Sequence, residues 1–134
     1  GIIYVNVAFD LGAVQPDDVP LLSLFASCLK QNGLTTGEDF VAVAERIGAT
    51  TGGVSASVVN SVVRGRDEPQ AHLIVSGKSM AAQAGELSAV ISDLLLHANL
   101  DNQQRVSTLV GEMVANMESA QRGRSRLLVI HSRK

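Results

Sequence analysis

The middle of the chain, TGGVSASVVNSVVRGRDEPQAHLIVSGKSM (residues 51–80), contains two segments with the pattern of β-strands. From Val54 to Val58, apolar residues alternate with serine, the period of two expected for a strand with one buried face. Residues 71–76 form a second short apolar run, and the intervening RGRDEP (residues 64–69) carries the glycine and proline that end strands. Gly52 and Gly53 in front of the two strands and Gly77 behind them allow a positive φ where the chain enters and leaves the pair. The pattern predicts an antiparallel hairpin.

The rest of the chain is predicted to form one strand and four helices. Residues 1–10 alternate in the manner of a strand. Asp17 or Asp18 is expected to cap a nearly buried helix, residues 35–38 (TTGE) form a capping-box pattern, and Asp101 is expected to cap the last helix. The expected elements are strands near 2–10, 53–63 and 70–77, and helices near 17–31, 38–47, 80–97 and 102–121.

The order of these elements, β-α-α-β-β-α-α, predicts an α/β (α+β) two-layer sandwich in which helices cover one face of a mostly antiparallel sheet. The length of 134 residues suits one domain. Aromatic residues make up only 3% of the chain, so its core must be aliphatic. A single cysteine, Cys28, excludes an internal disulfide and fits a reducing compartment.

The charge distribution excludes some classes of partner. Thirteen acidic and six basic residues precede residue 122, a net charge of −7, whereas residues 122–134 carry +5. The body therefore lacks the basic face and the stacking aromatic residues of a nucleic-acid binder. No apolar run approaches the ~20 residues of a membrane span. Because Gly1 lies directly on a strand pattern, we expect the chain to be a piece of a longer protein.

Three motifs of the hairpin region, TGGVS, SVVRGRDEP and IVSGKSM, resemble those of a known protease family. The chain is similar to the third homologous domain of presequence proteases, which are pitrilysin-type, inverted-motif zinc metallopeptidases that degrade targeting peptides inside organelles. The similarity covers residues 1–123. Residues 124–134 form a basic tail that departs from the family, and within it Leu127 to Ile130 could form a short edge strand or be foreign to the fold.

The resemblance also identifies where a catalytic site would lie. In catalytic members, a helix after the first strand carries H-x-x-E-H, in which two histidines bind zinc and the glutamate activates water. Here Val19 and Pro20 precede Leu21 and Phe25 at the histidine positions and Leu24 at the glutamate position. Hydrocarbon side chains cannot bind zinc or transfer protons. We therefore expect no catalytic residue, metal site or cofactor in this chain, with zinc held by the catalytic half of the parent protein.

The remaining polar residues are interpreted as structural. The three histidines and Cys28 have no spacing typical of a metal site. Residues 77–79 (GKS) resemble the end of a phosphate-binding loop, but His72 stands where that loop needs a glycine. Glu112 lies in a context faintly similar to that of the family's downstream zinc ligand, and base rates favour an exposed helical glutamate.

The turn between the two central strands has two interpretations. Arg64, Arg66, Asp67 and Glu68 form either a solvated turn or a docking surface for a neighbouring domain. Exposed turn charges contribute little to stability, which favours the first interpretation. The resemblance favours the second, because the family's domains pack into a larger shell.

Two functions follow from these observations. In the first, the chain is an inert domain that helps to enclose unfolded peptides in the chamber of a zinc endopeptidase of the mitochondrial matrix or chloroplast stroma. Its partners are then the other domains of that soluble protein, and the isolated chain is expected to self-associate through surface that those domains would cover. In the second, it is a stand-alone binding or assembly module on the same fold. An upstream H-x-x-E-H in the gene distinguishes the first from the second.

Overall fold

The computed structural model describes residues 1–62, 64–65 and 67–132. The order of strands and α-helices is the predicted β-α-α-β-β-α-α, so the expected fold class is confirmed. The elements are β1 (Ile2–Asp10), a 3₁₀ turn (Pro16–Leu21), α1 (Leu22–Gln31), α2 (Phe40–Thr50), β2 (Gly53–Val62), β3 (Pro69–Met80), a second 3₁₀ turn (Ala81–Gln83), α3 (Ala84–His97) and α4 (Gln103–Ser132).

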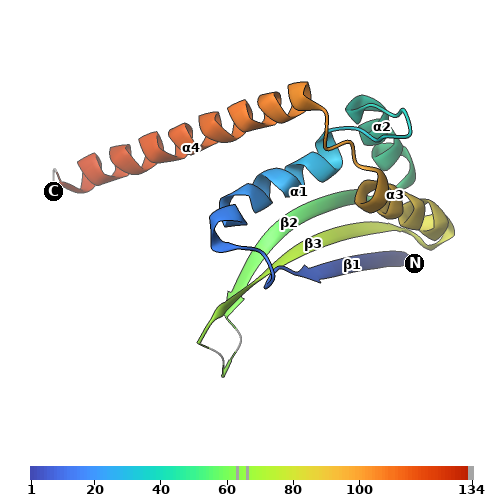
Figure 1. The fold of residues 1–134 in the computed structure, drawn as a ribbon, viewed down its shortest axis with the longest axis horizontal. Coiled ribbons are helices and arrows are strands. Elements are labelled where there is room, and N and C mark those ends of the chain that lie inside the picture. The colour runs from blue at the N-terminus through green and yellow to red at the C-terminus, as the bar shows by residue number, and fades with distance from the viewer. Residues whose placement is uncertain (63, 66, 133–134) are drawn as a thin grey trace.

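The three strands form one sheet in the order β1-β3-β2, and both pairings are antiparallel. The predicted hairpin of β2 and β3 is therefore confirmed. Because side chains alternate between the two faces of a sheet, the registers of the β1–β3 and β2–β3 pairings place a set of apolar residues together on the face that the helices cover. Two rows across that side consist of Val5, Gly77 and Val54, and of Val7, Val75 and Ala56. The helices α1, α2 and α3 all lie over this face (Figure 1).

The core lies between the sheet and the helices and is aliphatic, as the composition requires. Burial of one side chain such as Leu87 or Val90 stabilises the fold by ~1.5–3 kcal/mol. A smaller cluster under α1 joins Ala26, Leu29 and Leu73. The main cluster consists of Leu34, Val43, Ile47, Val54, Val75, Leu87, Val90, Ile91 and Leu94.

Gly77 has a different role from the predicted one. It lies within β3, which continues to Met80, and it is not among the glycines with positive φ. A Cβ atom at this position would lie 2.7 Å from Leu87 Cδ1 and 3.2 Å from Ile91 Cδ1. The missing side chain therefore allows α3 to pack closely on the centre of the sheet. The positive φ that glycine allows is therefore not used at Gly77, whereas Gly53, where the chain enters β2, has a φ of 126°.

Two helices begin with capping residues other than the predicted ones. The side chain of Asp39 caps α2 by accepting a 2.8 Å hydrogen bond from the backbone N–H three residues later. The expected capping box at residues 35–38 does not form, because Gly37 has a φ of 108°, which is incompatible with a helical turn. Asn102 caps α4 in the same way, rather than Asp101.

The first helical segment is less regular and less buried than predicted. Neither Asp17 nor Asp18 caps an α-helix, because both lie in the 3₁₀ turn and α1 begins after it without a side-chain cap. Leu21 is 58% exposed and Phe25 is 39% exposed. Only one side of α1 packs on the body, through the buried residues Ala26, Cys28 and Leu29.

The last helix is longer than predicted. α4 has 30 residues, about 45 Å, and its far half projects beyond α1 (Figure 1). Leu109 is buried, but Val114 and Met117 further along are exposed. Of the two alternatives for Leu127 to Ile130, the short edge strand is wrong, because these residues continue the helix.

Within the part of the chain that the structure describes, no helix is both long enough and apolar enough to cross a membrane.

Candidate functional site

The three positions of the degenerate zinc motif lie where the first 3₁₀ turn passes into α1. Leu21 ends the 3₁₀ turn, and Leu24 and Phe25 belong to the first turn of α1. Leu21 and Phe25 are exposed, and Leu24 is half-buried. None of these side chains has a lone pair that could bind a metal. The donor set of a pitrilysin-type zinc site is therefore incompatible with this segment.

Residues that could bind a metal do not converge elsewhere in the described part of the chain. Among residues 1–62, 64–65 and 67–132, no three or more His, Cys, Asp or Glu side chains converge in a way that could hold a metal ion. His72 lies in β3 opposite Asp10 and Val59, on the face away from the helices. His97 is exposed at the end of α3, and Glu112 is exposed on α4. Nothing in this arrangement provides a general base beside a nucleophile.

Cys28 is a core residue, as its position on an apolar helix face predicted. Burial raises the pKa of its thiol, an effect that the neighbouring Asn32 amide partly offsets. The amide nitrogen and oxygen of Asn32 are themselves buried without a hydrogen-bond partner of good geometry. A thiol of raised pKa is a poor nucleophile at neutral pH, so Cys28 does not mark a reactive site.

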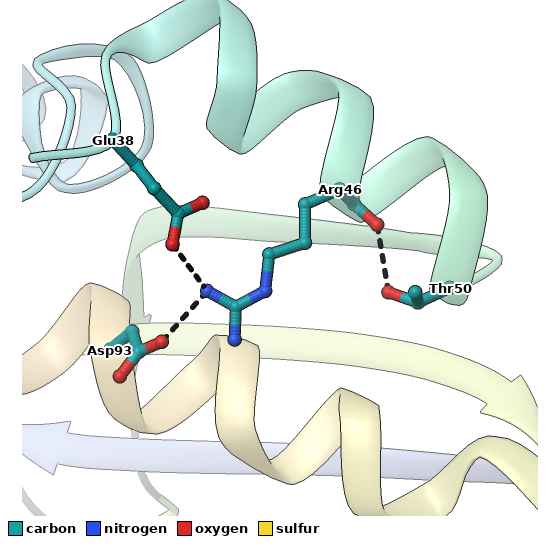
Figure 2. A network of polar contacts seen from close by, with 4 residues as sticks. All are labelled: Glu38, Arg46, Thr50 and Asp93. Atoms are coloured by element: carbon teal, nitrogen blue, oxygen red, sulfur yellow. Dashed lines mark hydrogen bonds and ion pairs between the residues drawn. The ribbon is translucent and has the colours of Figure 1, made fainter.

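Arg46, which the sequence analysis did not single out, links α2 to α3 at the edge of the core. Arg46 Nη1 lies 2.8 Å from Asp93 Oδ2 and 3.1 Å from Glu38 Oε1, and Figure 2 shows both carboxylates converging on it. The Thr50 hydroxyl donates a 2.7 Å hydrogen bond to the Arg46 carbonyl. The bridge fixes α2 against α3. Its partners lie 8 and 47 residues away in sequence, so only the helical position of Arg46 beside an apolar stripe could have indicated it.

A second arginine positions the start of α4. The guanidinium of Arg105 lies 3.8 Å from the centroid of the Phe40 ring, a cation–π contact. Its Nε donates a 3.0 Å hydrogen bond to the Gln31 carbonyl at the end of α1. Asn102 adds a 3.3 Å hydrogen bond from its side-chain nitrogen to the Asn32 carbonyl. These contacts fix the N-terminal end of α4 against the end of α1 and the start of α2. Further along, α4 carries exposed apolar side chains.

An apolar hollow lies between α1, α3 and the end of β1. Its volume is about 560 Å³. Phe25, one of the degenerate motif positions, contributes to it, and Leu96 at its rim is 75% exposed. Its lining consists of Phe9, Phe25, Leu29, Leu73, Ser92, Leu95 and Leu96. This lining can contact another apolar surface but carries no group for catalysis.

A shallower polar hollow of about 300 Å³ includes side chains on the opposite face of the sheet. Tyr4, Asn6, Ser55, Ser76 and Lys78 provide hydroxyl, amide and ammonium groups along three adjacent strands. None of the helices in the described ranges lies over this face (Figure 1). Such groups can form hydrogen bonds with the backbone of an extended peptide whatever its side chains are.

The charged turn lies at the tip of the β2–β3 hairpin, far along the strands from α3 (Figure 1). Arg64, Asp67 and Glu68 are exposed, and Gly65 turns the chain with a φ of 90°. Arg66 lies outside the described residues. None of the ion pairs found in the described part of the chain involves this turn. Docking of a neighbouring domain here stays a prediction.

Comparisons with known proteins agree with the resemblance of the hairpin motifs. The family model for the domain associated with M16 peptidases of subfamily C matches residues 1–131. Presequence protease 1, chloroplastic/mitochondrial, of Arabidopsis thaliana is 40% identical over 122 residues, which are 91% of this chain and 11% of that protein. Protein HypA of Clostridium perfringens is 25% identical over 118 residues, 87% of this chain and 12% of that protein. The chain thus spans about a ninth of the length of these relatives.

Proposed function

The chain belongs to the family of domains associated with M16 peptidases of subfamily C, and we propose that it is a non-catalytic domain of a presequence-protease-like zinc metalloendopeptidase. The observation that carries this proposal is the family match over residues 1–131 combined with hydrocarbon at Leu21, Leu24 and Phe25. The family match supports a peptidase as the parent protein. The apolar residues at the three motif positions support the view that this domain has no catalytic zinc site. Zinc and the general base then belong to other domains of the parent.

The proposed role of this domain is to help enclose unfolded peptides in a closed chamber. The polar face of the sheet supports this role. Tyr4, Asn6 and Lys78 on that face, with the serines beside them, offer hydrogen-bonding groups that suit any extended backbone. A wall of this kind tolerates many sequences, as an enzyme that degrades targeting peptides and other short unfolded peptides requires.

The same comparison supports a proposed cellular location. The Arabidopsis relative is named as chloroplastic/mitochondrial, and the parent of this chain is proposed to act in the mitochondrial matrix or the chloroplast stroma. A single cysteine, Cys28, fits a compartment in which thiols stay reduced.

The proposal is tested on the longer polypeptide encoded by the same gene. We expect an H-x-x-E-H segment upstream, and we expect that polypeptide to cleave an unstructured, fluorescently quenched peptide that this chain alone leaves intact. Removal of residues 1–132 should abolish the cleavage, because the chamber is then open. A gene that lacks the motif and yields this chain as a complete folded product would instead establish the stand-alone module.

A further inference from the structure

Both outer strands of the sheet, β1 and β2, lack a partner on their outer side in the described part of the chain, and β1 is the one of the two that the helices cover less. All nine residues of β1 pair with β3 on one side, and no strand in the described part of the chain pairs with the other side. Such an edge presents a row of N–H and C=O groups to any extended segment. β1 also carries an apolar sequence, IIYVNVAFD, with only one charged residue, Asp10, to discourage pairing. The edge is therefore suited to accept another strand.

The helical layer also stops short of this edge. α1 and α2 pack on β2 and α3 packs on β3, while the substantial contacts of β1 are with β3. On the helix side, Phe9 of β1 is 41% exposed, whereas its neighbour Leu73 of β3 is buried. The apolar hollow lies beside Phe9 and is closed on its far side by α1 and α3. The free edge of β1 therefore lies beside the part of the sheet that the helices leave uncovered.

We propose that a strand-and-helix segment from another part of the longer polypeptide docks here, its strand paired with β1 and its amphipathic helix seated in the apolar hollow. This inference rests on the proposed function, since it takes the chain to be one domain of a longer peptidase. The Arabidopsis relative supports it: 122 matched residues are 11% of its length, so about 1,100 residues are present in all. Most of such a protein lies outside the matched region.

Other occupants fit only part of this surface. A second copy could pair its β1 with this β1 about a two-fold axis perpendicular to the sheet. Its own β1 also lacks a helix over Phe9, so that dimer would leave both hollows unfilled. An extended peptide could satisfy the edge but has no helix for the hollow. Only a segment with both elements covers the backbone groups and the apolar side chains of Phe9, Phe25 and Leu96 together.

The test uses cysteine labelling in this chain and in the longer polypeptide. Leu96→Cys places a thiol at the exposed rim of the hollow, and Glu45→Cys is the control on the outer side of α2. Cys28 stays silent because it is buried and its thiol has a raised pKa. With a maleimide at neutral pH, both variants of this chain should react rapidly. In the longer polypeptide, the Leu96→Cys thiol should react at least about tenfold more slowly, as expected for a site exposed only by local opening, and the Glu45→Cys thiol at an unchanged rate.

Amide hydrogen exchange of the unmodified proteins provides a second readout that needs no variant. The outward-facing amides of β1 should exchange rapidly in this chain and slowly in the longer polypeptide, because a paired edge protects its N–H groups. Equal labelling of the Leu96→Cys thiol in both proteins, with unprotected β1 amides, would overturn the inference. Continued peptide cleavage by that longer polypeptide would show that the proposed function stands nevertheless.

Two further outcomes would assign the surface to other occupants and so refute the inference. Protection in the longer polypeptide that grows with its concentration would identify a second copy. Protection in the longer polypeptide only when the unstructured peptide is added would identify substrate.

Discussion

Replacing Gly77 by alanine should destabilise the fold although it adds a single methyl group. The new Cβ would lie 2.7 Å from Leu87 Cδ1, whereas carbon atoms in contact are normally about 3.5–4.0 Å apart. Leu87 would have to move by about 1 Å, and it is 1% exposed in the middle of the main core cluster. Close-packed interiors have no space for such a shift.

The magnitude follows from two opposing effects. Overpacking a core by one methyl group costs about 1–3 kcal/mol. The loss of glycine's freedom in the unfolded chain returns about 0.4–1 kcal/mol. We therefore expect a net loss of about 1–2 kcal/mol in the free energy of unfolding for Gly77→Ala. For a chain of this length, each kcal/mol lost should lower the melting temperature by about 3–5 °C.

The assay is urea unfolding of the variant followed by far-UV circular dichroism, with Gly85→Ala as the matched control. Gly85 lies on α3, and a Cβ there would have no atom within 4 Å, so its replacement should be neutral or stabilising by up to about 1 kcal/mol. In the double variant Gly77→Ala/Leu87→Ala, the added methyl should cost little, because the clashing atom is gone. A neutral Gly77→Ala, or a penalty unchanged by Leu87→Ala, would refute the packing argument.

Three other perturbations test separate parts of the structure. Arg46→Met should lower the free energy of unfolding by about 1 kcal/mol, because it leaves the carboxylates of Glu38 and Asp93 facing each other, and the loss should be smaller in high salt. Ion pairs are screened in 1 M salt, so an equal loss in unfolding titrations with and without 1 M salt would contradict the ion-pair account. Asp39→Ala should cost about 1 kcal/mol through the lost cap of α2, and Asp39→Asn should restore most of it. Burial raises the pKa of the Cys28 thiol, so the unfolded chain loses that proton first as the pH rises past about 8.5; stability should fall from there upward, and unfolding curves of Cys28→Ala should show a shallower decline with pH.

The fold class followed from the sequence because its evidence is periodic and local. Alternation in residues 1–10 and around Val54 to Val58 gave the strands, and the polar turn with Gly65 between β2 and β3 gave their antiparallel pairing. The absence of zinc ligands at Leu21 and Phe25 could also be read directly, because it concerns residue type alone.

The features that the sequence did not indicate depend on contacts between distant segments. The close approach of α3 to Gly77 requires knowing that Leu87 lies above it. The apolar hollow depends on the end of β1 lying beside α1 and α3, so no single segment carries its pattern. The capping residues were mispredicted because more than one residue able to cap a helix lies near each helix start. At α2, the positive φ of Gly37 prevents a helical turn at residues 35–38, so the helix begins later, after Asp39. Leu127 to Ile130 is apolar in either conformation, and its β-branched residues did not outweigh continuation of the preceding helix.

The central claim, that this domain carries no chemistry of its own, is tested most directly by titrating the 134-residue chain with zinc while following hydrolysis of an unstructured, fluorescently quenched peptide. Leu21, Leu24 and Phe25 stand where two ligands and the general base would be needed, so we expect neither stoichiometric high-affinity zinc binding nor hydrolysis. One zinc ion bound tightly per chain, together with hydrolysis that a chelator abolishes, would contradict the account.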